Sequence, residues 1–378
     1  MARLGDIVKI EASSKSVVSD KFWLLNLDMV EQQTGNVIAY NYVDRDALNG
    51  SIIQFDTDCV LYSKLRPNLN KVVIPMQDGC ATSEMLPLRP NTKVLTREYL
   101  TVFLRSDSFV TWAVSKTAGA KMPRLGSKEL LGKEIPLPSI SEQTHIAGQF
   151  AKVDELIALR KEQLAKLDQL VKSRFIELFG EPLTLLNCGK TIPLEKVFSE
   201  ITVGFVGEAA SSYVKIGVPY LRTQNVRKGY IDFSGLIYVS EEFHNTNQKS
   251  QIKPGDIVVS RVGVNRGMAA VIPQALEDAN IANCLIIKKE ATVNSNYLAY
   301  YLNISYGLSP KFGASVGSAQ GVINTAILKK WEVFLPPYAQ QEQFAAFVEQ
   351  TDKSKLAIQQ SLDKLELLKK ALMQEYFG

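Results

Sequence analysis

Apolar side chains recur at alternating spacings of three and four residues through a long stretch of the chain that ends at Gly180. Such a stripe is typical of a helix that packs lengthwise against a partner helix. The stretch contains no internal proline and is rich in good helix formers, and Gly180 and Pro182 end it. We therefore predict a helix over 143–180, about 55 Å long at 1.5 Å per residue. The stripe consists of Ile146, Phe150, Val153, Ile157, Leu164, Leu167, Val171 and Leu178, and it is interrupted by Arg160 and Arg174.

The same pattern occurs a second time, 198 positions further along the chain. Residues 135–180 align without a gap on residues 333–378, and 13 of these 46 positions are identical. Both copies begin with Leu-Pro followed by a Gln, and both end in Phe-Gly. A repeat of this length indicates a duplicated unit. We predict four segments: a globular domain over 1–141, a long helix over 142–182, a second domain over 183–339 and a second long helix over 340–378.

Each globular segment combines short apolar runs with one amphipathic stretch, and Gly, Asn and Pro separate them. This pattern favours mixed α/β domains. The predicted fold class is therefore α+β: two globular mixed α/β domains separated by two long antiparallel, coiled-coil helices. Expected strands lie at 22–25, 59–62, 71–74, 134–137, 219–226 and 255–261, and expected helices at 98–115, after Ser127, and at 297–306.

The direction of the two long helices follows from the order of the segments. The first helix leaves domain one and leads to domain two, so the second can return only by running antiparallel to it. A duplicated unit arranged in this way has a pseudo-twofold axis. Matching the apolar layers suggests a register with Arg160 opposite Lys369 and Arg174 opposite Lys355. Its apolar pairs are Ile157 with Leu372, Leu164 with Leu365, Leu167 with Leu362, and Val171 with Ile358.

Composition narrows the class of protein only modestly. The 378 residues are 46% hydrophobic, which is ample for two cores, and the net charge of +4 does not by itself predict a nucleic-acid-binding protein. Four cysteines lie far apart and only two histidines are present, so we expect no metal site. The first residues reach Asp6 before any apolar run and no apolar stretch is long enough to span a membrane, so we expect a cytoplasmic location.

Catalytic motifs are weak or absent. Leu335-Pro336-Pro337-Tyr338 resembles the Asn/Asp-Pro-Pro-Tyr loop of amino-methyltransferases, but Leu335 cannot grip a base amino group. The sequence contains no phosphate-binding loop of the GxxxxGK[ST] type and no Glu-x-Lys of the metal nucleases. We therefore predict no catalytic residues and no cofactor in this chain.

Cationic and amide side chains gather in loops at matching places in both globular segments. Arginine can pair with guanine and Asn or Gln with adenine in the major groove, while lysine tends to hold phosphate. Each cluster alone is typical of a solvated loop, but their recurrence in both repeats favours ligand contacts. The predicted DNA-binding residues are Lys64, Arg66, Asn68, Asn70, Lys71, Lys121 and Arg124 in the first segment, and Arg222, Gln224, Asn225, Arg261, Asn265, Arg266, Ser318 and Gln320 in the second.

Taken together, the two dissimilar globular segments and the two repeated helices, introduced by LPSISEQ at 137–143 and LPPYAQQEQ at 335–343, resemble the specificity (S) subunit of type I restriction–modification systems. The resemblance covers the whole chain. It implies that each domain reads one half of a bipartite target in double-stranded DNA, and that the helices act as a spacer and dock two methyltransferase subunits. S-adenosylmethionine, Mg and ATP would then belong to partner methyltransferase and motor/endonuclease subunits.

Other classes of function stay open at this point. One alternative is a specificity subunit that serves a fused methyltransferase–nuclease. The others are a stand-alone DNA enzyme, which the missing motifs disfavour, and a coiled-coil scaffold for ligands other than DNA, which the paired cationic loops disfavour. The bases that each domain would read do not follow from the sequence.

Overall fold

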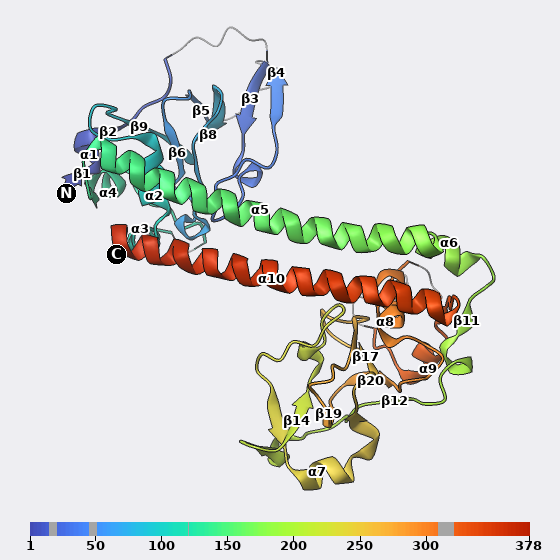
Figure 1. The fold of residues 1–378 in the computed structure, drawn as a ribbon. Coiled ribbons are helices and arrows are strands. Elements are labelled where there is room, and N and C mark those ends of the chain that lie inside the picture. Colours follow the sequence, from blue (N-terminus) through green and yellow to red (C-terminus); the bar gives the residue numbers. More distant parts are fainter. Residues whose placement is uncertain (15–20, 45–50, 120, 309–320) are drawn as a thin grey trace. The chain divides into compact units, whose positions relative to one another are not determined.

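The computed structural model describes residues 1–14, 21–44, 51–119, 121–308 and 321–378. Two helices of 40 residues each, α5 (Ile140–Phe179) and α10 (Tyr338–Phe377), are its longest elements (Figure 1). Tertiary contacts divide the chain into two units, and each unit contains one globular domain and a part of both long helices. Unit 1 comprises Met1–Glu162 and Gln359–Gly378, and unit 2 comprises Gln163–Ile358.

The apolar stripe predicted for the long helices is their buried face. In unit 1, Ile146, Phe150 and Val153 are buried, and Val171 is buried in unit 2. All eight residues expected to pair the helices are buried or half-buried, in line with a heptad seam. Helix α5 begins at a capping box in which Ser139 and Glu142 exchange hydrogen bonds, which satisfies backbone N–H groups that the helix start would leave free.

Cross-helix contacts within each unit show that α5 and α10 run antiparallel, as predicted. In unit 1, Lys369 Nζ lies 2.6 Å from Asp154 Oδ1, and Arg160 donates to Ser361 Oγ at 3.2 Å. In unit 2, Lys355 Nζ lies 2.7 Å from Asp168 Oδ1. The predicted register is wrong, because it placed Lys369 opposite Arg160 and Lys355 opposite Arg174. Each lysine instead pairs with an aspartate of α5 that lies one to two helical turns before the arginine predicted to face it, so like charges do not meet.

The globular part of unit 1 consists of two four-stranded sheets with helices against one of them. One sheet has the order β2-β9-β6-β7 and the other β4-β3-β8-β5; in the second, β3 and β8 are parallel. A two-stranded ribbon of β1 and β10 lies at the start of α5 (Figure 1). The bounds are β1 (Ala2–Arg3), α1 (Leu4–Ile7), β2 (Val8–Ile10), β3 (Lys21–Leu25), β4 (Asn41–Asp44), β5 (Ile52–Phe55), β6 (Val60–Ser63), β7 (Val72–Val73), β8 (Gly79–Thr82), β9 (Met85–Pro90), α2 (Arg97–Arg105), α3 (Asp107–Ser115), α4 (Ser127–Gly132) and β10 (Glu134–Ile135).

Strand β6 is buried on both faces and separates two cores. Val60 and Tyr62 point toward the core that α2, α3 and the long helices share, and Leu61 points toward the core between the two sheets. This alternation is the two-residue period of a strand, and burial on both faces explains why β6 reads as a continuous apolar run.

Unit 2 repeats this plan. One sheet has the order β12-β20-β17-β18 and the other β13-β15-β14-β19-β16, with β14 parallel to β19, and a ribbon of β11 and β21 adjoins the start of α10. Val258 of β17 faces the core between the sheets, while Ile257 and Val259 face α8 and the long helices. The bounds are α6 (Pro182–Asn187), β11 (Ile192–Pro193), β12 (Ile201–Val203), β13 (Tyr213–Val214), β14 (Val218–Leu221), β15 (Ile237–Val239), α7 (Glu241–Thr246), β16 (Gln251–Ile252), β17 (Ile257–Ser260), β18 (Ala269–Val271), β19 (Ala279–Ile281), β20 (Cys284–Ile287), α8 (Ser295–Ser305), α9 (Thr325–Lys329) and β21 (Glu332–Val333).

The single helix expected over 98–115 is two helices. Chain direction changes at Ser106, which is extended and whose hydroxyl caps α3 by accepting a hydrogen bond from the backbone N–H of Phe109. A serine that bonds to nearby backbone groups favours such a cap over a helix interior. Both halves keep their apolar side chains in one core, which is why the pattern alone resembles one continuous helix.

A buried glutamine ties each domain to the start of its long helix. Gln143 is fully buried; its Oε1 accepts from the backbone N–H of Thr96 at 2.9 Å, and its Nε2 donates to the carbonyls of Val94 and Pro138 at 2.8 and 2.9 Å. Thr96 is the N-cap of α2. In unit 2, Gln341 accepts from the N–H of Asn294, the N-cap of α8, at 3.0 Å and donates to Pro336 at 2.8 Å.

Candidate nucleic-acid interface

In each unit a parallel strand pair ends beside a short 3₁₀ turn. In unit 2, β14 ends at Leu221 and continues into turn η6 (Thr223–Asn225). In unit 1, β3 ends at Leu25 and continues into turn η1 (Leu27–Met29). Backbone bridges between Val226 and Ile231, and between Val30 and Val37, follow the two turns. The two turns therefore occupy the same place in the two copies of the fold.

Turn η6 owes its shape to Asn225, which is only 1% exposed. Its Oδ1 accepts from the backbone N–H of Arg222 at 2.9 Å, and its Nδ2 donates to the carbonyls of Asp232 and Ser234 at 2.8 and 3.2 Å. Every polar atom of this amide is occupied within the fold. Asn225 therefore holds the turn on which its neighbours are presented, and its predicted contact with bases stays a prediction.

A second loop, residues 261–267 after β17, adjoins turn η6. Asn265 is buried, and its Nδ2 donates to the carbonyls of Val226 at 3.1 Å and Thr223 at 3.4 Å. Arg266 donates through Nε to the Tyr306 hydroxyl at 2.9 Å and through Nη1 to the carbonyl of Gly321 at 2.6 Å. Through these bonds Asn265 and Arg266 stabilise the loop, and their predicted contacts with DNA stay predictions.

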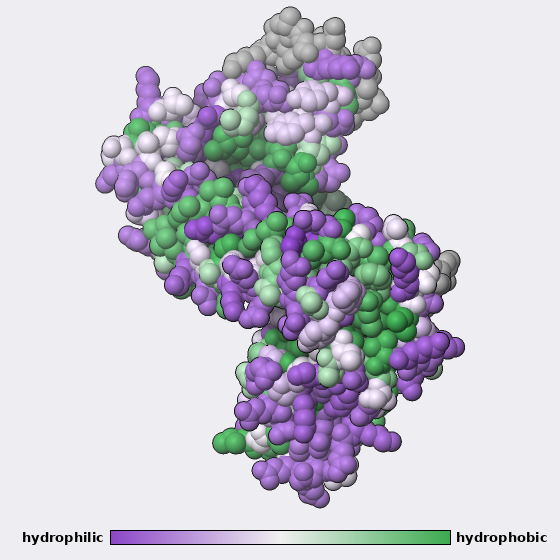
Figure 2. All heavy atoms as spheres, turned by 45° about the vertical axis from the view of Figure 1, so that its right-hand side comes forward, coloured by the Kyte–Doolittle hydropathy of each residue, from purple (hydrophilic) through white to green (hydrophobic). Residues whose placement is uncertain are grey.

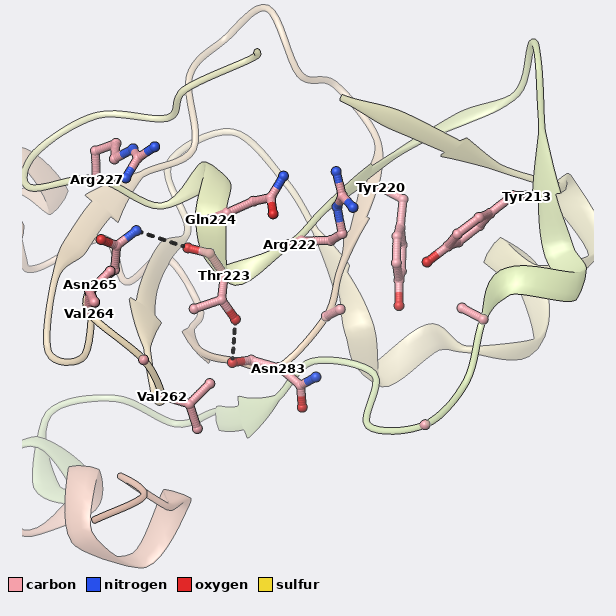
Figure 3. Close-up of a pocket in the computed structure, with 14 residues that line it drawn as sticks. Tyr213, Tyr220, Arg222, Thr223, Gln224, Arg227, Val262, Val264, Asn265 and Asn283 are labelled. Carbon is pink, nitrogen blue, oxygen red and sulfur yellow. Dashed lines mark hydrogen bonds between the residues drawn. The ribbon is translucent and has the colours of Figure 1, made fainter. Parts of the chain in front are cut away.

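Turn η6 and loop 261–267 enclose a pocket of about 470 Å³ (Figure 3). Figure 3 shows the side chains of Arg222 and Gln224 pointing in the same direction from the turn, with the rings of Tyr220 and Tyr213 beside them. Among the residues that the structure describes, no aspartate or glutamate lines the pocket, so its polar side chains carry guanidinium, amide and hydroxyl groups. The lining residues are Gly207, Ala209, Tyr213, Tyr220, Arg222, Thr223, Gln224, Arg227, Val262, Gly263, Val264, Asn265, Ala282 and Asn283.

The chemistry of the pocket suits the edge of a base pair. Gln224 is exposed and its amide can both donate and accept, while Arg222 uses one Nη to bond the Gly235 carbonyl at 2.8 Å. Burial raises the pKa of Tyr220 to about 12, so its hydroxyl stays neutral. Val264, at 96% exposure, offers an apolar group of the kind that contacts a thymine methyl.

Arg227 also lines the pocket, and sequence reasoning missed it. Its guanidinium lies 3.4 Å from Asp232, a partly exposed pair that leaves donors available. On the face that Figure 2 shows, the end of unit 2 that carries α7 displays mainly hydrophilic side chains. The adjacent Arg227-Lys228 pair, directly after the turn, is the sequence signal that would have pointed to this position.

The corresponding loop of unit 1, residues 64–71, is also anchored to its neighbouring turn. Lys71 Nζ donates to the carbonyl of Leu27 in turn η1. Asn70 is buried and donates to the Arg105 carbonyl at 3.1 Å. Lys71 and Asn70 therefore hold the loop, and their predicted contacts with DNA stay predictions. The loop bends through a 3₁₀ turn, Pro67–Leu69, between left-handed Arg66 (φ 50°) and Asn70 (φ 51°).

The remaining predicted residues divide into exposed and paired groups. Arg66, Asn68 and Lys121 are exposed, and Lys64 and Arg261 are half-buried. Arg124 faces the Glu84 carboxylate, with Nε 3.1 Å and Nη2 3.0 Å from Oε1, so an acid already neutralises it and raises its pKa. Ser318 and Gln320 lie outside the described residues.

Within the described residues no group of three or more His, Cys, Asp or Glu side chains is placed to hold a metal ion. No helix in the part of the chain that the structure describes is long and apolar enough to cross a membrane.

Two copies of one mixed α/β domain, each presenting a turn and a loop with exposed polar side chains and each tied to long antiparallel helices, define a recognition protein with two reading modules. The chain belongs to the family described as the type I restriction modification DNA specificity domain, whose model matches residues 1–169 and 199–368.

Curated relatives are specificity subunits of type I restriction enzymes. The chain is 23% identical over 311 residues to the MjaVIII specificity subunit of Methanocaldococcus jannaschii, which covers 78% of this chain and 72% of that protein. It is 28% identical over 159 residues to the EcoDI specificity subunit of Escherichia coli, covering 41% of this chain and 35% of the relative. The matched part thus spans about a third of the EcoDI subunit.

Solved structures share the fold at low sequence identity. The S subunit of a type I restriction–modification system from M. genitalium matches with a TM-score of 0.60 and 14% identity, covering 100% of this chain and 95% of that one. A chain from a study of complex assembly in the type I R-M system matches with a TM-score of 0.59 and 18% identity, covering 100% and 96%. The predicted fold class is confirmed.

Proposed function

We propose that this chain is the DNA sequence-recognition subunit of a type I restriction–modification complex, in which each globular domain reads one half of a bipartite target. The observation that supports the proposal most directly is the duplicated pair of loops. Both units place a short turn next to a loop that is hydrogen-bonded to it, and both expose polar side chains there. Two readers joined by helices of about 60 Å each favour two short recognised stretches with an unread gap between them.

The chain itself performs no chemistry in this proposal. It contributes recognition, and partner methyltransferase subunits supply methyl transfer from S-adenosylmethionine. Motor/endonuclease subunits would add ATP- and Mg-dependent cleavage. Exposed leucines on the long helices support docking of partners there: Leu159 and Leu367 in unit 1, and Leu170 and Leu356 in unit 2. Large apolar side chains repeated on exposed helix faces are typical of surfaces that another protein covers.

The test is a methylation map. The chain is expressed with its methyltransferase partner in a host without other DNA methylation, and modified bases are located by sequencing. We expect one bipartite motif with two defined halves and a fixed number of unspecified base pairs between them. A single continuous motif, or no motif although the complex assembles, would contradict the proposal. Methyl transfer by the purified chain alone would instead favour the stand-alone enzyme.

A further inference from the structure

The two turns η1 and η6 present different side chains from the same backbone frame. Counting from the last residue of the parallel strand, Leu25 corresponds to Leu221, and Val30, beyond the turn, corresponds to Val226. All four of these side chains are buried, and at both places the two units use the same residue type. The frame of the turn is therefore maintained by matching core residues in both units.

The neighbouring loop holds the same carbonyl in both units. Lys71 Nζ donates to the carbonyl of Leu27 in unit 1, and Asn265 Nδ2 lies 3.4 Å from the carbonyl of Thr223 in unit 2. Leu27 and Thr223 are each the first residue of their turn. In each unit, a side chain of the loop thus holds the first carbonyl of the turn, although the donor is a lysine in one unit and an asparagine in the other. Turn and loop therefore form one joint surface in both units.

Only the exposed positions of the turns differ in chemistry. The second residue of η6 is Gln224 and the second residue of η1 is Asp28, and both side chains are exposed. The residue before each turn is Arg222 in unit 2 and Asn26 in unit 1. Asp28 makes no hydrogen bond within the described part of the chain. The loop 64–71 of unit 1 carries cations, whereas this turn and the residue before it carry an acid and an amide, Asp28 and Asn26.

Electrostatics limits what an exposed aspartate can do on a DNA-facing surface. Phosphates repel it, so it is unfavourable as a backbone contact. A carboxylate is an acceptor only, and the base edge that matches it in the major groove is the amino group at cytosine N4. A glutamine both donates and accepts, which matches the N6 and N7 atoms of adenine.

We propose that η1 and η6 are equivalent base-reading turns, in which Asp28 accepts a hydrogen bond from a cytosine amino group in the first half-site and Gln224 reads an adenine in the second. This inference rests on the proposed function and goes beyond it, because it names the reading element of unit 1 and the base that each domain contacts at this position.

The test exchanges acid and amide without changing the size of the side chain. Asp28→Asn should move the preferred base pair at one position of the first half-site from C·G toward A·T and leave the second half-site unchanged. Gln224→Glu should do the reverse, moving one position of the second half-site from A·T toward C·G. Methylation of the original site should fall by about tenfold or more in each variant, the range expected for loss of one good base contact.

Asp6→Asn is the matched control, because Asp6 is an exposed acid of unit 1 on α1 and its replacement removes the same charge. It should leave both half-sites as they are. The inference is overturned if Asp28→Asn retains the wild-type first half-site, or if it changes binding to all sequences equally, as a purely electrostatic effect would. Absence of any bipartite motif in the wild-type map would contradict the proposed function itself, so the two failures are distinguishable. Thermal unfolding of each complex shows that the variants are folded.

Discussion

The buried glutamines at the start of the long helices provide the sharpest test of how the domains are held. Gln143→Met keeps nearly the same volume but removes the amide. Three backbone groups then lose their partner: the N–H of Thr96 and the carbonyls of Val94 and Pro138. All three lie in a site where the side chain is 0% exposed, so water does not readily replace the lost bonds.

The magnitude follows from the number of orphaned groups. Each buried donor or acceptor left without a partner costs about 1–3 kcal/mol, so Gln143→Met should destabilise unit 1 by about 3–9 kcal/mol. Gln341→Met removes two such bonds and should destabilise unit 2 by about 2–6 kcal/mol. The free energy of unfolding of a domain is about 5–15 kcal/mol, so either substitution should remove a large part of it although no exposed residue is changed.

Hydrogen exchange read by mass spectrometry resolves the two units separately. Gln143→Met should accelerate exchange in α2, whose N-cap it releases, and leave α8 at the wild-type rate. Gln341→Met should show the opposite. Gln169→Met is the control, because Gln169 is exposed on α5. Wild-type exchange in α2 of the Gln143→Met variant, or equal acceleration in both units, would refute the assignment of these glutamines as local ties.

A charged substitute adds a pH signature to this test. In Gln143→Glu the carboxylate can still accept from the Thr96 N–H, but its second oxygen meets two carbonyls. Protonation restores a donor, so the folded protein should raise the pKa of this group above its unfolded value of about 4.3. The variant should therefore be least stable at neutral pH and regain stability as the pH falls through the raised pKa toward about 4. A loss of stability that does not change with pH would show that the oxygen does not face the carbonyls.

Three further outcomes are expected. Burial would raise the pKa of Asp56, but hydrogen bonds, led by that from Arg89, lower it to about 2. Asp56→Asn should therefore destabilise unit 1 at neutral pH, and the stability of the wild type should fall by about 2 kcal/mol as the pH drops from about 4 toward 2. An unfolding midpoint of the wild type that does not change over this pH range would contradict the prediction. Asp154→Cys with Lys369→Cys should crosslink within one chain, and failure under oxidation would reject the observed register. Arg66→Ala should weaken recognition of the first half-site alone by about 1–3 kcal/mol, whereas an equal loss on any DNA would identify a phosphate contact.

The large features of the fold could be predicted because they rest on repetition. A stripe that runs for about nine turns predicts a long helix, and a second copy implies a second helix and a second domain. The register could not be obtained in this way, because an apolar layer recurs every seven residues and a slip of one heptad buries almost the same area. Local ion pairs then select the register: Asp154 and Asp168 pair with Lys369 and Lys355, which the pattern of apolar layers counted only as unfavourable.

The sequence indicates which loops carry polar side chains, but it does not indicate which of those side chains hold the loops in place. Asn70, Asn225 and Asn265 have the amide chemistry that reads adenine, and the same chemistry closes turns by bonding to backbone. Burial separates the two roles, and burial depends on contacts from distant strands. The base-reading role that we propose for Asp28 does not follow from the sequence either, because a single acid in a short turn carries no signal until the two turns are matched through their core residues.

The division between conserved frame and differing exposed positions also has a physical rationale. Within this one chain, the groups that hold a reading turn in place are buried, and the two copies meet the same requirements with the same or equivalent residues: Leu and Val in the core, a donor to the first carbonyl of the turn, and a glutamine at the helix start. Changing any of them leaves a cavity or an orphaned polar group, at a cost of several kcal/mol. Exchanging Asp for Gln at an exposed turn position costs the fold almost nothing. A duplicated recognition domain can therefore change which base it reads while its attachment to the long helices stays the same.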